Sequence, residues 1–213
     1  MSAWSDFQPL VMMRLPECPT FVVDDVARLQ AIRFFLDTRT WRDAAPETKI
    51  AATTAGTALY TITPPPQGEL CGICEAWYDG RRIDEARNQQ YRDRREWPSD
   101  APPENGTPSR VATASGTQVR LLPTPDVDDK VLVASFAYCP TTDAASLLTT
   151  LFSAYSDAIA EAIVAECAGH KGKPWSDATI ASRAAGEYNR LALQYASRAG
   201  SVGRRLRTRA QAI

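Results

Sequence analysis

The chain has 213 residues, enough for one large domain or for a domain with a sizeable insertion. Hydrophobic residues make up 44%, charged residues make up 23%, and the formal net charge is -1, so the overall charge gives no support for nucleic-acid binding. No apolar run approaches the ~20 residues of a membrane span, and residues 1–10 lack the features of a secretion signal. We therefore expect a protein that is made and folded in a cytoplasm and contacts no membrane.

The N-terminal part of the chain is predicted to contain an arm and one helix. Residues 1–20 hold three prolines that interrupt any helix, and they are expected to form an irregular arm. A helix is predicted over residues 21–42, with Thr20 as its N-cap. Apolar residues at helical spacing predict one face directed at the core, formed by Val22, Val26, Leu29, Ile32 and Leu36.

Residues 46–143 change to a period of two, which predicts an inserted antiparallel β segment of about six or seven strands. Hairpin turns are expected at Ala55-Gly56 and at Asp79-Gly80. Residues 85–96 could form a charged, exposed helix, and residues 97–109 read as a proline-rich loop. The predicted strands cover residues 49–52, 58–63, 69–79, 81–84, 110–114, 118–122 and 130–138.

Two long helices are predicted to follow the β segment, over residues 144–168 and 176–198, with Ser176 as the N-cap of the second. None of the three long helices can bury an apolar face alone, so residues 21–45 and 144–200 are expected to form a helical bundle. The predicted fold class is therefore α+β: a bundle of one N-terminal and two C-terminal helices, with the antiparallel β segment inserted. Residues 201–213 are left as a basic C-terminal tail.

The spacing Cys71-Gly72-Ile73-Cys74 could mark a redox pair or half of a zinc site. A redox pair needs its first cysteine at a helix N-terminus, whereas the following residues predict a strand and a turn. A structural zinc needs four ligands, and the other three cysteines and the single histidine are isolated in the sequence. Packing within a strand is the favoured interpretation, and a small zinc-binding or redox module using Cys71 and Cys74 stays open as the alternative.

Other candidate chemistry is weaker. The loop Gly169–Pro174 holds the only histidine, His170, but it follows a helix, and Pro174 replaces the Ser or Thr of a phosphate loop. The acidic turn at residues 126–129 lacks the closing Glu of a calcium loop. Three glutamates could pair as acid and base but are each interpreted as exposed helix residues: Glu161, Glu166 and Glu187. We therefore expect no enzyme activity, no cofactor and no metal site.

The only candidate binding residues are four arginines near the C-terminus: Arg204, Arg205, Arg207 and Arg209. As a solvated tail they need no partner. As a basic strip they could contact DNA phosphates or an acidic surface of a partner protein. Nothing in the sequence resembles a helix-turn-helix or another module that reads DNA sequence.

Four landmarks, taken in order, resemble head–tail connector proteins of tailed bacteriophages, and are similar to the tail tubular protein A class of short-tailed phages. They are Phe35–Arg42, Ala76–Arg82 followed at a distance by Gly106-Thr107-Pro108, Val119–Asp126, and Gly172–Ser176. The resemblance spans about residues 4–200. The chain departs from the pattern at Phe34-Phe35 and in the charged segment 85–105.

The resemblance implies a structural virion protein of the neck, assembled in the host cytoplasm. It implies a homo-oligomeric ring, commonly of about twelve subunits, that surrounds the DNA channel. The partners it implies are the portal protein on the head side and a tail or nozzle protein on the other, with packaged DNA close by. It brings no catalytic residues to this chain.

Overall fold

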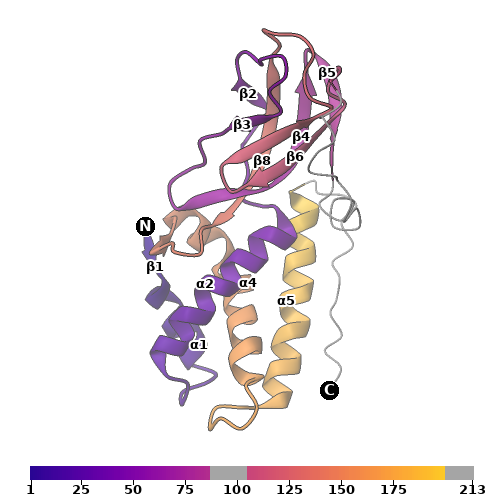
Figure 1. Ribbon diagram of the computed structural model, residues 1–213. Helices are drawn as coiled ribbons and strands as arrows, with labels where there is room; N and C mark the ends of the chain where they lie inside the picture. The colour runs from indigo at the N-terminus through magenta and orange to yellow at the C-terminus, as the bar shows by residue number, and fades with distance from the viewer. Residues whose placement is uncertain (87–104, 200–213) are drawn as a thin grey trace. The chain divides into compact units, whose positions relative to one another are not determined.

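The computed structural model describes residues 1–86 and 105–199 and confirms the α+β class (Figure 1). The chain divides into two compact units. Unit 1 contains Met1–Thr40 and Cys139–Ile213, and unit 2 contains Trp41–Tyr138. The predicted helix at 85–96 and most of the proline-rich loop at 97–109 lie outside the described residues. Within the described part, no helix has the length and apolar character needed to cross a membrane.

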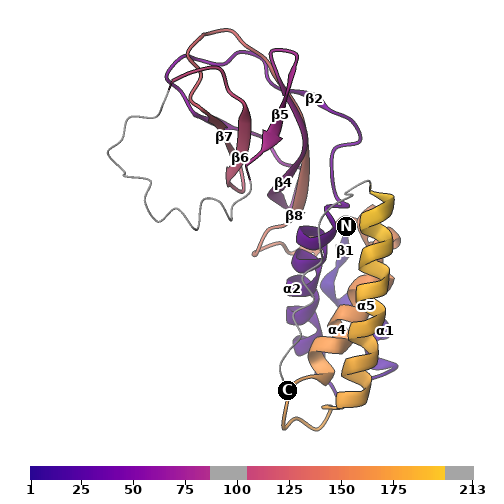
Figure 2. The ribbon, with the colours of Figure 1, turned by 90° about the vertical axis from the view of Figure 1, so that its right-hand side faces the viewer.

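Unit 1 is built on three long helices: α2 (Thr20–Thr38), α4 (Thr149–Ala168) and α5 (Ala178–Arg198). α4 packs against both α2 and α5 (Figure 2), and α2 also meets α5 directly where Phe34 contacts Tyr195. The core of this unit holds a cluster of aromatic rings in edge-to-face and tilted contacts, with centroids 5.1–6.0 Å apart. Its members come from all three helices: Phe34, Phe35, Tyr155 and Tyr195.

The helix ends differ from the prediction by a few residues. Thr20 is the first residue of α2 rather than its cap, and the helix ends at Thr38 because Arg39 adopts a left-handed conformation with φ of 52°. Asp177, not Ser176, caps α5, since its carboxylate accepts hydrogen bonds from the backbone N–H groups of the helix's first turn. Both are good capping residues, so their order along the chain could not be decided from the sequence.

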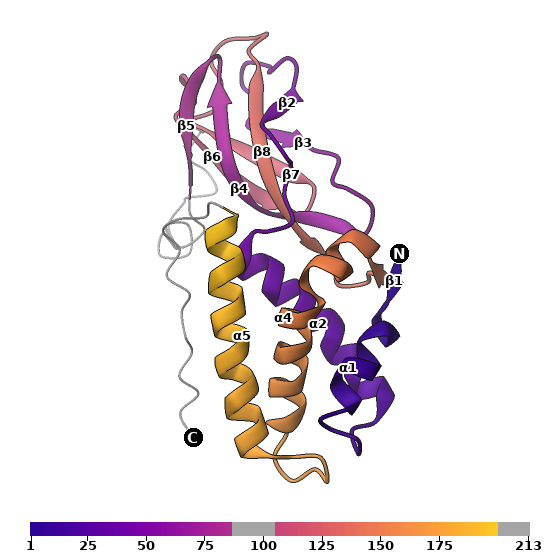
Figure 3. The ribbon, with the colours of Figure 1, turned by 180° about the vertical axis from the view of Figure 1, so that it is seen from behind.

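The N-terminal arm was predicted to be irregular, and this is wrong for most of it. It forms a short strand, a 3-10 helix and a short α-helix: β1 (Ser2–Ala3), η1 (Trp4–Phe7) and α1 (Gln8–Met12). Figure 3 shows α1 beside α2. Pro9 lies in the first turn of α1, where a missing N–H costs nothing. β1 pairs with β9 (Ser146–Leu147), so the region predicted as the start of the second long helix is partly a strand.

Unit 2 is a curled seven-stranded sheet with the order β2-β8-β4-β5-β6-β7-β3 (Figures 1 and 2). Its strands are β2 (Glu47–Ile50), β3 (Leu59–Thr61), β4 (Gly68–Tyr78), β5 (Arg81–Glu85), β6 (Arg110–Ser115), β7 (Gln118–Leu122) and β8 (Leu132–Pro140). The sheet is mixed rather than antiparallel as predicted, because β5 and β6 pair in parallel, with Asp84 opposite Arg110. No local sequence pattern indicates that β5 and β6 pair in parallel, because the pairing depends on the path of the long connection between them.

One predicted hairpin is confirmed and the other is wrong. β4 and β5 are joined by Asp79-Gly80, and both residues adopt positive φ as a tight turn requires. The strands on either side of Ala55-Gly56 do not pair with each other. β2 pairs with β8 and β3 pairs with β7, at the two ends of the sheet.

A polar cluster at one edge of unit 2 fixes the segment that enters the sheet. The carboxylate of Asp43 accepts hydrogen bonds from the backbone N–H of Phe136 and the hydroxyl of Tyr138, at 2.8 and 3.0 Å. It also contacts the ammonium of Lys49 at 2.8 Å. Burial alone would lower the pKa of Lys49, but its hydrogen bonds to Asp43 and Glu47 outweigh that and raise the pKa to about 12. Burial, followed by Asp43, raises the pKa of Tyr138 to about 12.

Candidate partner-binding surfaces

The side of α2 that faces away from the core carries a row of large apolar residues. Phe21, Leu29 and Leu36 are 68%, 55% and 39% exposed, and Val22 and Ile32 are half-buried. We call this surface the outer face of α2 and define it by Phe21, Val22, Asp25, Leu29, Ile32 and Leu36. The sequence predicted that Val22, Val26, Leu29, Ile32 and Leu36 would fill the core. Of these five, Val26 is buried and the prediction is wrong for Leu29 and Leu36.

The core side of α2 uses a second apolar row. Four apolar residues on this side are fully buried: Val23, Ala27, Ala31 and Phe34. Each of them follows a residue of the predicted row by one or two positions. A helix that is apolar on both sides is ordinarily buried on both sides. The sequence therefore contains two apolar rows at different angles around α2. Only one of them can face the chain's own core. The other row is a candidate surface for a partner protein.

α5 has a different exposed side. Its residues Ser182, Gly186, Arg190, Leu193 and Ser197 recur at helical spacing and are all exposed. We call this surface the outer face of α5 and define it by these five residues together with Arg183. An ideal Cβ added to Gly186 would meet no atom within 4 Å, so the fold of the described chain does not require glycine there. The surface is formed by small and basic side chains, with Leu193 55% exposed.

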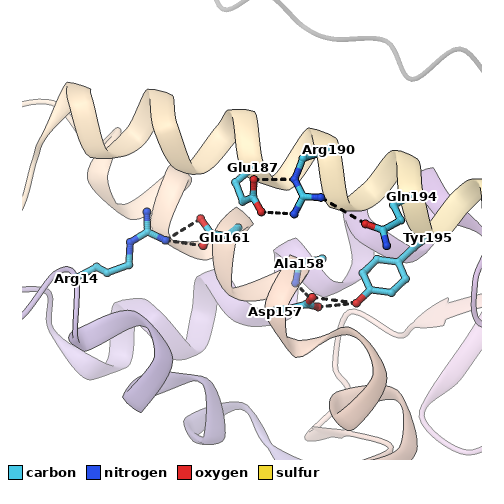
Figure 4. A network of polar contacts seen from close by, with 8 residues as sticks. All are labelled: Arg14, Asp157, Ala158, Glu161, Glu187, Arg190, Gln194 and Tyr195. Carbon is cyan, nitrogen blue, oxygen red and sulfur yellow. Dashed lines mark hydrogen bonds and ion pairs between the residues drawn. The ribbon is translucent and has the colours of Figure 1, made fainter.

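The three glutamates considered as catalytic candidates all contact arginines. Arg14 donates to both carboxylate oxygens of Glu161 at 2.7 Å, and Glu187 pairs with Arg190, which lowers the pKa of Glu187 (Figure 4). Glu166 contacts Arg33 at 3.4 Å. Each carboxylate is therefore held as an ion-pair partner. Because each of the three carboxylates is engaged with an arginine, none of them is placed as a general acid beside a general base.

Asp157 and Tyr195 link α4 to α5 near the aromatic cluster. The hydroxyl of Tyr195 lies 3.0 Å from both carboxylate oxygens of Asp157 (Figure 4). Burial, followed by the hydrogen bond to Asp157, raises the pKa of Tyr195. A tyrosine held protonated in this way acts as a hydrogen-bond donor between helices, so the contact is structural.

Cys71 and Cys74 both lie on β4 and are half-buried. Residues three apart on a strand point to opposite faces, so the two thiols are not directed at one point. No cysteine forms a disulfide, and the described residues contain no group of three or more His, Cys, Asp or Glu side chains placed to hold a metal ion. The geometry therefore gives no support to the zinc-binding or redox alternative.

The remaining candidates are parts of turns. His170 lies in the loop between α4 and α5, where its backbone N–H donates to the carbonyl of Cys167. In the acidic turn, Asp128 accepts a hydrogen bond from the backbone N–H of Ala55, and Asp129 adopts a positive φ. The four predicted binding residues Arg204, Arg205, Arg207 and Arg209 lie outside the described residues, so their role stays a prediction.

Comparisons with known proteins agree with a chain organised around surfaces rather than a catalytic centre. A search of curated proteins found no match. The family model described as SU10 adaptor protein matches residues 5–212, which is nearly the whole chain. The resemblance to head–tail connectors noted from the sequence is thereby confirmed at the level of the family. The chain belongs to the SU10 adaptor protein family, a family of phage head–tail adaptors.

Proposed function

We propose that this protein forms a ring, of about twelve copies, that joins the portal at the vertex of the phage head to the tail and lines the channel through which DNA leaves. The observation that carries the proposal is the family match over residues 5–212. The protein acts in this account as a structural component of the virion neck and performs no catalysis. Two observations agree with that role. The three glutamates are paired with arginines, and Cys71 and Cys74 point to opposite faces of β4.

The two outer faces support self-assembly into a ring. A closed ring of identical subunits needs a head-to-tail interface, in which one surface of each copy contacts a different surface of the next. Unit 1 offers two such surfaces on different helices, the apolar outer face of α2 and the small, basic outer face of α5. A chain that kept the outer face of α2 in solvent would lose the stabilisation that burial of its apolar area provides.

We assign the portal contact to the C-terminal end of α5 and the basic segment that follows it, and the tail contact to unit 2. Arg204, Arg205, Arg207 and Arg209 give the C-terminal segment a charge suited to an acidic protein surface. Unit 2 exposes Leu59 and Val127, apolar residues that are 41% and 50% exposed and available to a second partner. A net charge of -1 leaves the chain without the strong positive field that would retain DNA in the channel.

The proposal is tested in the phage that encodes the chain. If the gene is inactivated, we expect DNA-filled heads and free tails to accumulate, because head and tail lack the connecting ring. Purified protein added to such an extract should restore tailed, infectious particles. Electron microscopy and plaque counts measure both results. Normal tailed particles that lack the protein would contradict the proposal.

A further inference from the structure

A helix-to-helix contact between neighbouring copies follows from the composition of the two outer faces. The outer face of α2 is a ridge: Phe21, Asp25, Leu29, Ile32 and Leu36 follow one another at steps of four, four, three and four residues. The outer face of α5 repeats the same steps with Ser182, Gly186, Arg190, Leu193 and Ser197. Four of the five side chains in the α2 row are large and apolar, and three of the five in the α5 row are small, so the α2 row can pack as a ridge against the α5 face.

The charges of the two faces are complementary. Asp25 is the one charged residue within the apolar row of α2, and its side chain is 72% exposed. Its contact with Arg28 on the same helix is long, at 3.7 Å. The outer face of α5 carries Arg183, and its second arginine, Arg190, is already paired with Glu187. A partner that buries the α2 row must bring a positive charge to Asp25, and the α5 face does so.

The positions of these charges along the helices also agree. α2 and α5 run in the same direction in unit 1 (Figures 1 and 2). Asp25 and Arg183 each lie in the first third of their helices. Rotation of a second copy about an axis along the bundle therefore brings Arg183 of that copy to about the height of Asp25 of the first. A heterologous contact repeated in this way generates a ring.

We infer that the outer face of α2 of one copy packs against the outer face of α5 of the next copy, with Asp25 paired to Arg183 and the apolar row over Gly186. This inference rests on the proposed ring and names the surfaces that close it. This arrangement explains why a glycine stands at position 186, because a residue without a side chain lets a large apolar residue approach the α5 backbone.

Cross-linking tests the contact directly. The full chain would carry a benzophenone amino acid in place of Leu29, and equal amounts of isotopically light and heavy protein would be mixed. The sample would be irradiated both alone at high concentration and after assembly on portal rings. We expect mixed-isotope cross-links from residue 29 to peptides of α5. Cross-links to residues 200–213 or to any other segment, or no mixed cross-links in either sample, would overturn the inference.

Charge reversal provides a second test with matched controls. Asp25→Arg and Arg183→Asp should each weaken association between copies about tenfold, because like charges then meet at the contact. The double variant should restore association, since each contact regains an opposite pair. Asp6→Arg and Lys173→Asp, which reverse exposed charges that belong to neither face as defined, should have no effect. A double variant as weak as the single variants would overturn the inference.

Gly186→Leu separates assembly from folding. The position is exposed with open space around it, so leucine should leave the thermal unfolding midpoint unchanged or raise it, yet block the approach of the neighbouring helix. The tests also separate this inference from the proposed function. Cross-links from residue 29 to α5 between copies that ignore portal rings would contradict the function alone. Rings on the portal with cross-links elsewhere would contradict the inference alone.

Discussion

The Nη1 atom of Arg14 lies 2.7 Å from both carboxylate oxygens of Glu161, and this ion pair joins the N-terminal arm to α4 (Figure 4). The two side chains are 27% and 23% exposed, so water screens the pair only in part. Trp4 adds a second link from the arm, because its indole N–H donates to the carbonyl of Ala144 at 2.8 Å. The arm is thus part of unit 1 rather than a separate tail.

Removal of the arginine should therefore weaken unit 1. We expect Arg14→Ala to lower the free energy of unfolding by roughly 1–2 kcal/mol, because Glu161 is left half-buried without its partner. Urea unfolding of Arg14→Ala, Glu161→Ala and the double variant measures the coupling between the two residues. Arg190→Ala, which removes a more exposed pair with Glu187, should have a smaller effect. A coupling energy near zero would contradict the assigned role.

Two glycines should respond in opposite directions to alanine. Gly186→Ala should raise the free energy of unfolding by about 0.5–1 kcal/mol, because alanine favours a helix interior and the added methyl group meets no atom. Gly68→Ala should lower it, because the new Cβ would lie 2.6 Å from Cη2 of the Trp41 ring. Thermal unfolding of both variants beside the unchanged protein measures the shifts. Equal effects of the two substitutions would contradict the packing described.

The cluster around Asp43 should make stability fall at high pH. The pKa of Lys49 is raised from 10.5 to about 12, and that of Tyr138 from 10.0 to about 12, so the folded state holds both protons more tightly than the unfolded state. Their contribution to stability is complete below about pH 10 and is lost as the pH rises through about 12. Urea midpoints measured between these values should decline, and the decline should be smaller in Lys49→Met. An unchanged decline in that variant would argue against the cluster as its source.

Cys71 and Cys74 should be dispensable for metal content and assembly. Protein purified without chelators should contain no stoichiometric zinc, since the two thiols lie on opposite faces of β4. The variant with Cys71→Ser and Cys74→Ser should fold and bind the portal as the unchanged protein does. Elemental analysis and portal binding are the two measurements. One zinc per chain, lost in the variant together with its fold, would restore the zinc-binding alternative.

The basic C-terminal segment should be needed for portal binding. Truncation after Gly200 removes Arg204, Arg205, Arg207 and Arg209 and should abolish docking on purified portal rings, because the positive charge that meets the portal is lost. The truncated chain should keep its helical circular dichroism, since α5 ends at Arg198. Undiminished docking would show that the portal contact lies elsewhere on the chain.

The elements that the sequence predicted well are those with strong local signals. The strand at 130–138 is a β-branched and aromatic run, and it corresponds to β8, which is buried on both faces. The Asp79-Gly80 turn carries its own conformational preference. In α5, apolar residues at helical spacing face inward as an amphipathic helix predicts: Ala184 is buried, while Tyr188 and Tyr195 are half-buried. In each case a few neighbouring residues determine the outcome.

The elements that it predicted poorly depend on distant residues. β2 and β3 flank a real turn, since Gly56 has a φ of 79°, but each strand pairs with another partner far along the chain. α2 has two apolar rows, and the core covers one of them. Phe34 and Phe35 lie in the core, where their rings contact Tyr155. For the same reason the candidate surface was not predicted. Leu29 and Leu36 were assigned to the core because the apolar pattern does not indicate which row is exposed.

The measurement that tests the adaptor assignment most directly is the mass of the purified protein alone and mixed with its portal ring, by native mass spectrometry. We expect the protein to join the portal with a fixed, symmetric stoichiometry, one copy for each portal subunit or a simple multiple of that number. A protein that remains separate from the portal at every concentration, or that binds in variable numbers, would contradict the proposal that it forms the ring between head and tail.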